Sequence, residues 1–441
     1  RAAKPLADGA VTEDWPRYLG ASDDATSRET KLLKEWPDAG LPIVWELERD
    51  ATYAAPTVAD GWLFSFDLAD GHERLECRDP ETGELRWRFN YPVDYSDRYG
   101  FASGPRASPV IDGDLVILAG VTGLLHAVEA KSGKMLWKRD LQSDYGHKLG
   151  FFGYGPAPFV WKDLVLVNVG GVGEAAGKGV CVAAFDKRTG EEKWRYLDSW
   201  GASYSSPVVR KLRGKDVLLV FAGGESRPPH GGLLALDPAS GELHHRFPWR
   251  ADKYESVNAS VPIAIDDKYV FLSECYAKGG VLLEFADDLS AKPVWEERWF
   301  GMHWMTPLQW GGHIYGFAGR NKPDVQFKCA RVSDGEVLWG DDMRYQHEVG
   351  GREMTLSFFR GSLLRADGGR VFALGEDGVF AELELGPDGV KTLRQCQLFV
   401  AEQAWALPVI HRGLLYVAQH TRDFVDGKKA RLICYDFRAA E

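Results

Sequence analysis

Apolar residues occur along this chain in short runs that are separated by glycine- and aspartate-containing turns. In the first well-defined unit, the run 108–111 precedes Asp112-Gly113, a pair typical of a hairpin turn because glycine accepts positive φ. A second run covers 115–118, residues 124–129 alternate between apolar and polar, and a further turn leads into Met135-Leu136-Trp137. Four short antiparallel strands in about fifty residues are typical of a propeller blade.

The same unit recurs along the chain, and its clearest marker is Gly-x-x-x-Trp where the predicted fourth strand begins. The intact copies are Gly83/Trp87, Gly133/Trp137, Gly190/Trp194 and Gly335/Trp339, and the altered copies are Gly241/His245, Ala291/Trp295 and Gly389/Leu393. Intervals of roughly fifty residues indicate one structural unit repeated. We expect the tryptophans to pack between neighbouring blades rather than to bind a ligand.

Eight predicted first strands are recognisable, and most begin with proline, which is tolerated at the start of a strand because its missing N–H breaks no ladder. They begin at Pro56, Pro109, Pro158, Pro207, Pro262, Pro307, Leu364 and Pro408. Residues 42–47 read as a fourth strand without a blade, and 407–437 supply three strands without a fourth. Pairing of the two ends closes a ring and removes its free edges.

The sequence therefore predicts an all-β fold. The chain is expected to form an eight-bladed β-propeller of four-stranded antiparallel blades, closed by pairing of the N-terminal strand with the C-terminal blade. Residues 42–441 are the predicted single propeller domain, and residues 1–41 are a predicted leader that wraps it.

Composition narrows the classes of function. The net charge of −11 and the pI near 5.6 argue against a nucleic-acid surface. No apolar stretch reaches the ~18 residues that a membrane span needs. The cysteines show no CxxC spacing, so no metal site is expected. Because Cys77, Cys329 and Cys434 share a repeat position that alanine fills elsewhere, free buried thiols are favoured over disulfides.

Candidate binding residues follow from blade topology. Loops between the second and third strands open on the same face as the blade-to-blade connections, so residues three or four positions before each first strand should ring the channel mouth. These residues are Tyr53, Arg106, Tyr154, Tyr204, Asn258, His303, Trp304, Arg360 and Trp405, and Glu255, Arg320 and Arg352 lie near the same mouth. An aromatic, basic funnel suits a polar ligand with flat faces, such as a sugar chain or a quinone. The alternative is that the aromatic residues simply plug the channel.

The predicted acid–base residues lie in the same loops. His147, His303 and His347 are candidates because imidazole titrates near neutral pH, and Tyr154 and Tyr204 could assist. Such a set suits β-elimination on a uronic acid-containing glycan, whereas a carboxylate pair drawn from Glu255, Glu353 and Glu402 would suit glycoside hydrolysis.

The repeats resemble the quinoprotein-like superfamily of PQQ-repeat propellers. The resemblance rests on residues 75–87, 182–190 and 233–241, each of which follows the pattern Leu-x-Ala-x-Asp-x-x-Thr-Gly with one replacement, and it covers about residues 42–438. The segment 14–20 looks like the entry segment of exported, planctomycete-type members. The resemblance implies export to the periplasm or secretion. The superfamily includes PQQ-dependent dehydrogenases and BamB-type assembly lipoproteins.

Three functional hypotheses remain open. In the first, an exported propeller binds, and in its stronger form also cleaves, a glycan-like ligand in the funnel. In the second, the chain is a PQQ-dependent alcohol or sugar dehydrogenase with calcium. Typical members of that group carry a vicinal disulfide and a calcium held by Glu, Asn and Asp; here Glu255 and Asn258 lie in one loop without a matching Asp motif or a Cys-Cys pair. In the third, it is a non-catalytic BamB-like scaffold with a protein partner.

Overall fold

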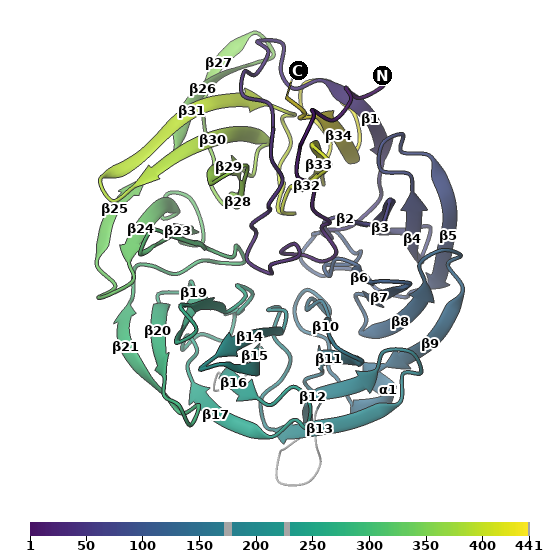
Figure 1. Ribbon diagram of the computed structural model, residues 1–441, viewed down its shortest axis with the longest axis vertical. Helices are drawn as coiled ribbons and strands as arrows, with labels where there is room; N and C mark the ends of the chain where they lie inside the picture. Colours follow the sequence, from purple (N-terminus) through teal and green to yellow (C-terminus); the bar gives the residue numbers. More distant parts are fainter. Residues whose placement is uncertain (172–178, 225–229, 440–441) are drawn as a thin grey trace.

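A computed structural model describes residues 1–171, 179–224 and 230–439. Within these ranges, eight four-stranded antiparallel sheets surround a central axis (Figure 1), which confirms the predicted eight-bladed propeller. In blades 1 to 7 the chain runs from the innermost to the outermost strand. No helix in the described ranges has the length and apolar character that crossing a membrane requires.

The strand bounds of the first four blades follow the predicted period. Blade 1 contains β2 (Thr57–Ala59), β3 (Trp62–Ala69), β4 (His72–Arg78) and β5 (Leu85–Pro92), and blade 2 contains β6 (Val110–Asp112), β7 (Leu115–Ala119), β8 (Leu124–Glu129) and β9 (Met135–Asp140). Blade 3 contains β10 (Phe159–Trp161), β11 (Leu164–Asn168), β12 (Gly179–Asp186) and β13 (Glu192–Asp198), and blade 4 contains β14 (Val208–Leu212), β15 (Lys215–Ala222), β16 (Gly232–Leu236) and β17 (Leu243–Pro248).

The remaining blades complete the ring. Blade 5 contains β18 (Ile263–Ile265), β19 (Tyr269–Glu274), β20 (Gly279–Phe285) and β21 (Ala291–Glu297), and blade 6 contains β22 (Leu308–Trp310), β23 (His313–Ala318), β24 (Gln326–Arg331) and β25 (Val337–Asp341). Blade 7 contains β28 (Ser362–Ala366), β29 (Arg370–Leu374), β30 (Val379–Gly386) and β31 (Gly389–Gln397), and blade 8 contains β32 (Val409–His411), β33 (Leu414–Gln419), β34 (Arg431–Asp436) and β1 (Ile43–Glu48). Two additions lie in blade-to-blade connections: helix α1 (Leu141–Tyr145) and the hairpin β26 (Arg344–Val349) and β27 (Arg352–Ser357).

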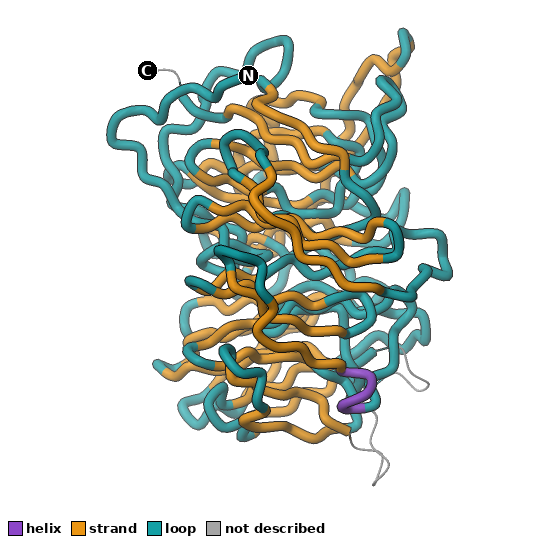
Figure 2. The backbone as a smooth tube through the Cα atoms, turned by 90° about the vertical axis from the view of Figure 1, so that its right-hand side faces the viewer, coloured by secondary structure: helices purple, strands orange, loops and turns teal. Residues whose placement is uncertain are grey.

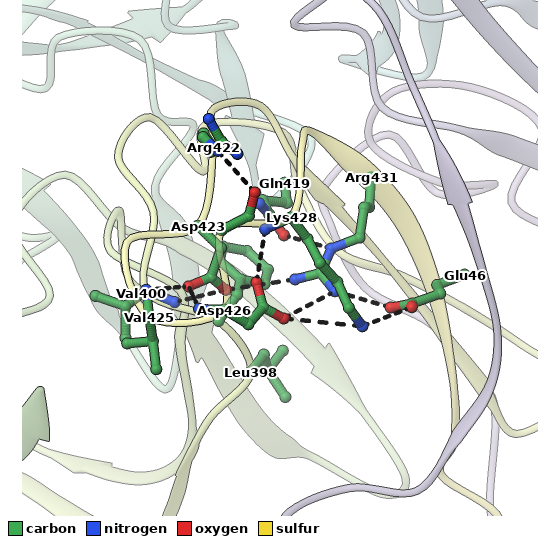
Figure 3. A network of polar contacts seen from close by, with 12 residues as sticks. Glu46, Leu398, Val400, Gln419, Arg422, Asp423, Val425, Asp426, Lys428 and Arg431 are labelled. Carbon is green, nitrogen blue, oxygen red and sulfur yellow. Dashed lines mark hydrogen bonds and ion pairs between the residues drawn. The ribbon is translucent and has the colours of Figure 1, made fainter. Parts of the chain in front are cut away.

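Closure of the ring takes place in blade 8. Strand β1 pairs antiparallel with β34, so the N-terminal strand completes the C-terminal blade as the sequence predicts. Side chains reinforce this pairing (Figure 3): the buried Arg431 guanidinium lies 2.8 Å from Glu46 of β1 and 3.4 Å from the buried Asp423. Arg431 also donates to Gln419 at 2.8 Å. One buried cation therefore ties β1 to the loop between β33 and β34.

The recurring Gly-x-x-x-Trp joins each blade to the next. The indole of Trp87 in blade 1 donates to the Ala130 carbonyl of blade 2 at 3.1 Å, and Trp137 donates to Lys187 of blade 3 at 2.9 Å. The same ring covers the following blade's glycine: a Cβ on Gly190 would lie 2.7 Å from Trp137 Cδ2. Glycine recurs because the preceding blade's tryptophan leaves no room for a side chain.

One altered interface, that between blades 4 and 5, agrees with this explanation. Blade 4 has His245 in place of tryptophan, and the next blade has Ala291 in place of glycine. The Ala291 amide donates to His245 Nδ1 at 3.3 Å. Once the larger indole is absent, a methyl group is accommodated at the glycine position. Tryptophan and glycine are thus lost together across one blade interface.

The two faces of the propeller differ. We call the face with the loops between second and third strands and the blade-to-blade connections the loop face, and α1, purple in Figure 2, lies on it. The opposite face, here the turn face, has the short turns. The N-terminal segment crosses the turn face at the channel (Figure 1): Trp15 pairs with Val58 of β2, and Ser27 donates to Arg365 of β28 at 2.8 Å.

A buried carboxylate fastens the N-terminal segment to blade 8. Glu29 is fully buried and accepts the backbone N–H groups of Arg412 at 2.7 Å and Gly413 at 2.9 Å, and that of Glu13 at 2.8 Å. Burial raises the pKa of Glu29 above its usual range. All six cysteines are free thiols and five are buried, which confirms the preference for free thiols.

The buried His126 of β8 leads to a prediction about acid stability. Its ring lies 4.1 Å from the Tyr91 ring, and burial, with a smaller effect of Lys138, lowers its pKa to about 4. The unfolded chain therefore takes up this proton first, and stability falls as the pH drops from 6.5 to about 4. His126→Phe should remove a loss of about 1.4 kcal/mol per pH unit in that window, measured by urea unfolding at several pH values. Parallel stability curves for the two proteins would contradict this prediction.

Candidate functional site

A cavity of about 590 Å³ opens at the channel mouth on the loop face. Its walls are mainly aromatic, and they come from the blade-to-blade connections and the loops of several blades. Tyr18 of the N-terminal segment also lines it, because that segment crosses the channel below. The lining includes Tyr53, Tyr99, Phe101, Arg106, Phe151, Phe152, Tyr204, Tyr254, Glu255, Tyr276, His303, Trp304, Arg320, Asn321, Arg360 and Trp405.

Many of the residues expected at the mouth do meet there. The cavity is lined by the predicted residues Tyr53, Arg106, Tyr204, Glu255, His303, Trp304, Arg320, Arg360 and Trp405. Their roles in binding or catalysis stay predictions. Their convergence follows from the fold, since every blade presents the same backbone position to the axis.

Tyr154 and Asn258 lie away from the cavity. The Tyr154 hydroxyl donates to the Asn168 carbonyl at 3.0 Å, and the Asn258 amide donates to Phe221 and Ala222 carbonyls at 3.1 and 3.2 Å. In these two blades the residues that line the cavity are the next ones along, Gly155 and Ala259. Successive residues of an extended chain point to opposite sides, so an offset of one residue turns a side chain from the axis into the blade.

The three histidines proposed for acid–base work lie in three different places. His303 lines the axial cavity, whereas the buried His147 borders a smaller pocket of about 240 Å³. His347 lies on β26 and borders a groove beside Trp36, and Arg352 begins β27 of the same hairpin. The three histidines therefore do not share one site. The connection between blades 6 and 7 forms a hairpin of its own, which the repeat pattern does not indicate.

An unbroken series of rings forms one wall of the cavity. Centroid separations are 5.4 Å from Tyr276 to His303, 4.3 Å from His303 to Trp304, 4.6 Å from Trp304 to Trp405 and 4.8 Å from Trp405 to Tyr53. The sequence did not point to Tyr276, because the prediction counted positions back from the first strand of each blade. Tyr276 instead follows β19, in a loop between a second and a third strand. The rings are tilted against one another, by 30° between Tyr53 and Trp405 and by 52° between Trp304 and Trp405, so the wall is aromatic but not flat.

Two of the three arginines in the cavity are already neutralised. Arg106 lies 2.9 Å from the buried Asp97, and Arg360 makes a bidentate pair with the buried Glu376 at 2.8 and 2.9 Å. Arg320 stacks on the Tyr276 ring at 4.6 Å, and no carboxylate in the described ranges lies within 4 Å of its guanidinium. Arg320 is therefore the cation with no counter-charge of its own.

His303 is a neutral group at physiological pH. Burial, followed by the charges of Arg360 and Arg320, holds its pKa well below the usual range. Its Nε2 lies 2.8 Å from the Tyr276 hydroxyl, and Nδ1 has no hydrogen-bond partner in the described part of the chain. A group that resists protonation so strongly is a poor general base near neutral pH.

The residues present do not fit a calcium-bound PQQ centre of the typical kind. No two cysteines are adjacent in the sequence, and the Asn258 amide is committed to backbone carbonyls. Glu255 is exposed at the cavity rim. Within the described ranges, no group of three or more His, Cys, Asp or Glu side chains is placed to hold a metal ion. The oxygen donors that calcium requires are thus not assembled here.

Comparison with known proteins places the chain among bacterial propellers. A family model described as outer membrane protein assembly factor BamB matches residues 71–341. The BamB of Burkholderia pseudomallei (strain K96243) is 25% identical over 324 residues, which cover 65% of this chain and 79% of that protein. The quinohemoprotein alcohol dehydrogenase of Comamonas testosteroni is 28% identical over 43% of this chain, but over only 26% of the enzyme.

Solved structures show the same fold. The crystal structure of the Comamonas testosteroni dehydrogenase superposes with a TM-score of 0.64 at 15% identity, covering 97% of this chain and 81% of that one. The crystal structure of BamB from Moraxella catarrhalis gives a TM-score of 0.55 at 14% identity, covering 91% of this chain and 99% of that one. Because the family model matches more than half of the chain, this protein belongs to the PQQ-like β-propeller family described as outer membrane protein assembly factor BamB.

Proposed function

We propose that this protein is a non-catalytic recognition propeller of the BamB type, which binds its partner with the loop face around the axial cavity. The observation that carries the proposal is that the cavity shares this face with solvent-exposed apolar side chains. Trp299 in the connection to blade 6 is 64% exposed, and Phe424 in the loop between β33 and β34 is 66% exposed. Exposed apolar groups beside a concave site are typical of an interaction surface.

The arrangement of titratable groups supports binding without chemistry. Glu255 is the one carboxylate among the described residues that line the cavity, whereas glycoside hydrolysis uses two that face each other. His147 and His347 lie elsewhere, and the lowered pKa of His303 makes it a weak base. The family relationship also supports binding without catalysis. The sequence match covers 79% of the Burkholderia pseudomallei BamB but only 26% of the Comamonas testosteroni dehydrogenase.

A glycan-like ligand is the second candidate. The rings of Tyr53, Trp304 and Trp405 form an aromatic wall of the kind that sugars contact, with Arg320 available for an acidic group. The relative from Burkholderia pseudomallei is named as an assembly factor for outer membrane proteins, and with the export-like segment 14–20 this supports a periplasmic or secreted protein.

An experiment that compares the two faces tests the main proposal. The probe is a fluorophore-labelled outer membrane β-barrel protein, diluted from urea into solutions of the purified propeller, with binding followed by anisotropy. Trp299→Ser combined with Phe424→Ser should weaken binding by about fivefold or more. Trp310→Ser is the matched control, because Trp310 is also exposed but lies on the turn face.

Three further outcomes separate the hypotheses. Equal effects of the two sets of substitutions, or no binding at all, would contradict the recognition role of the loop face. Binding of oligogalacturonates without release of unsaturated products would support the glycan candidate in its binding form. Dye reduction after addition of PQQ, calcium and an alcohol would favour a dehydrogenase and overturn the proposal.

A further inference from the structure

The charges around the axial cavity point to a more specific ligand, and this inference rests on the proposed recognition function. We propose that the cavity binds a planar aromatic monocarboxylate, whose carboxylate pairs with Arg320 and whose ring lies along the wall formed by Trp304, Trp405 and Tyr53. The class differs from PQQ, which is a tricarboxylate, and from a neutral sugar.

The first argument is the charge balance of the wall. Asp97 and Glu376 are buried behind Arg106 and Arg360, at 2.9 and 2.8 Å, so each of these arginines belongs to a satisfied ion pair. Arg320 makes no ion pair with any described carboxylate, and its guanidinium lies 4.6 Å from the centroid of the Tyr276 ring. A half-buried guanidinium beside an aromatic wall is more stable with a counter-ion than without one. Because Arg320 is the single cavity arginine without a carboxylate partner, it favours a ligand with one carboxylate.

The second argument is the continuity of the wall from that cation. Arg320 stacks on Tyr276, which contacts His303, and the ring series then runs through Trp304 and Trp405. A ligand with its carboxylate at Arg320 therefore has aromatic surface beside it over the rest of its length. Contacts between aromatic rings stabilise a complex by more than the burial of their apolar surface alone.

The third argument comes from hydrogen-bonding groups that have no partner. Nδ1 of His303 and the indole nitrogens of Trp304 and Trp405 are buried and unpaired in the described part of the chain. When the Tyr276 hydroxyl donates to His303 Nε2, Nδ1 carries the proton and is a donor. Buried donors without acceptors are rare in folded proteins. Three of them on residues that line one cavity favour a ligand with acceptor oxygens.

Glu255 restricts the ligand to a single negative charge. It is the only carboxylate among the described residues lining the cavity, it is exposed at the rim, and it is not paired with Arg320. A ligand with a second carboxylate would bring that group toward the mouth, where Glu255 repels it. The wall therefore selects a monoacid over a diacid of the same shape.

The test uses three probes of one shape and isothermal titration calorimetry. The probes are 2-naphthoate, its uncharged analogue 2-naphthamide and naphthalene-2,6-dicarboxylate. We expect 2-naphthoate to bind about tenfold more tightly than 2-naphthamide, because only the acid forms a charge-assisted pair. Arg320→Gln should reduce this ratio to about one, while Glu255→Gln should selectively strengthen binding of the dicarboxylate.

Arg298→Gln is the matched control. Arg298 also stacks on an aromatic ring, that of Trp299 at 5.1 Å, and lies on the loop face outside the cavity. Its replacement should leave all three affinities unchanged. Equal binding of acid and amide, a tighter dicarboxylate, or an Arg320→Gln variant that keeps the preference would overturn the assignment. Failure of all three probes would also overturn it, while the loop-face experiment with the unfolded barrel protein judges the recognition function separately.

Discussion

Replacement of Arg431 by methionine should destabilise the folded protein by about 3–5 kcal/mol, because it leaves a buried charge without its partner. Arg431 is 5% exposed and lies among Glu46, Asp423 and Gln419 at the seam between β34 and β1 (Figure 3). Asp423 is buried, so its carboxylate cannot regain water when the guanidinium is removed. The seam is also where the ring closes, so the loss affects the pairing on which the whole propeller depends.

Urea unfolding followed by tryptophan fluorescence measures the effect. Lys429→Met is the control, since Lys429 pairs with Glu48 across the same seam at 3.2 Å but both side chains are largely exposed. An exposed pair of this kind contributes about 0–1 kcal/mol. If the two variants lose similar amounts of stability, the buried network is not what holds the seam.

Gly190→Ala should cost about 3 kcal/mol, which combines left-handed backbone strain with overpacking against a neighbouring blade. Gly190 has a φ of +70°, and an added Cβ would lie 2.7 Å from the Trp137 ring. Gly214→Ala provides the comparison, because Gly214 has a φ of +75° with nothing within 4 Å of the added carbon. That variant should lose only about 1–2 kcal/mol, which is the cost of the backbone conformation alone.

A double variant separates the steric contribution from the backbone strain. Trp137→His reproduces the pair that the chain itself uses at His245 and Ala291. Combined with Gly190→Ala, it should destabilise the protein by less than the sum of the two single changes, because the methyl group no longer meets an indole. If the changes in the free energy of unfolding are strictly additive, the Trp137 ring and Gly190 do not interact.

The fold could be predicted because its determinants are local and repeated. Turn residues such as Asp112-Gly113, alternation within 124–129 and the Gly-x-x-x-Trp marker all concern neighbours in sequence, and their repetition along the chain strengthens the prediction. Even the closure by β1 followed from counting strands, since a blade without its fourth strand leaves an open edge. The physical meaning of the marker was only partly accessible, because the glycine is required by a tryptophan about fifty residues earlier.

The candidate site was predicted less completely, and particular residues show why. Trp304 and Trp405 were found because a fixed offset from the first strand carries side chains to the axis. Tyr154 and Asn258 were misplaced by a single position, which is enough to reverse a side chain in an extended segment. His347 was expected among the loops of this face, but it borders a separate groove beside Trp36, because its connection folds as a hairpin that the repeat does not encode.

The sequence by itself determined the blade, the number of blades and the face on which the long loops gather, since periodic patterning is a short-range property. Only the tertiary structure decided that Tyr18 lines the cavity from below, and that Arg106 and Arg360 pair with Asp97 and Glu376 while Arg320 has no carboxylate partner among the described residues. Those facts depend on which side chains from distant segments come within a few ångströms of one another. Whether two charges form an ion pair, and whether a side chain is enclosed, depends on those distances, and the linear order of residues does not determine them.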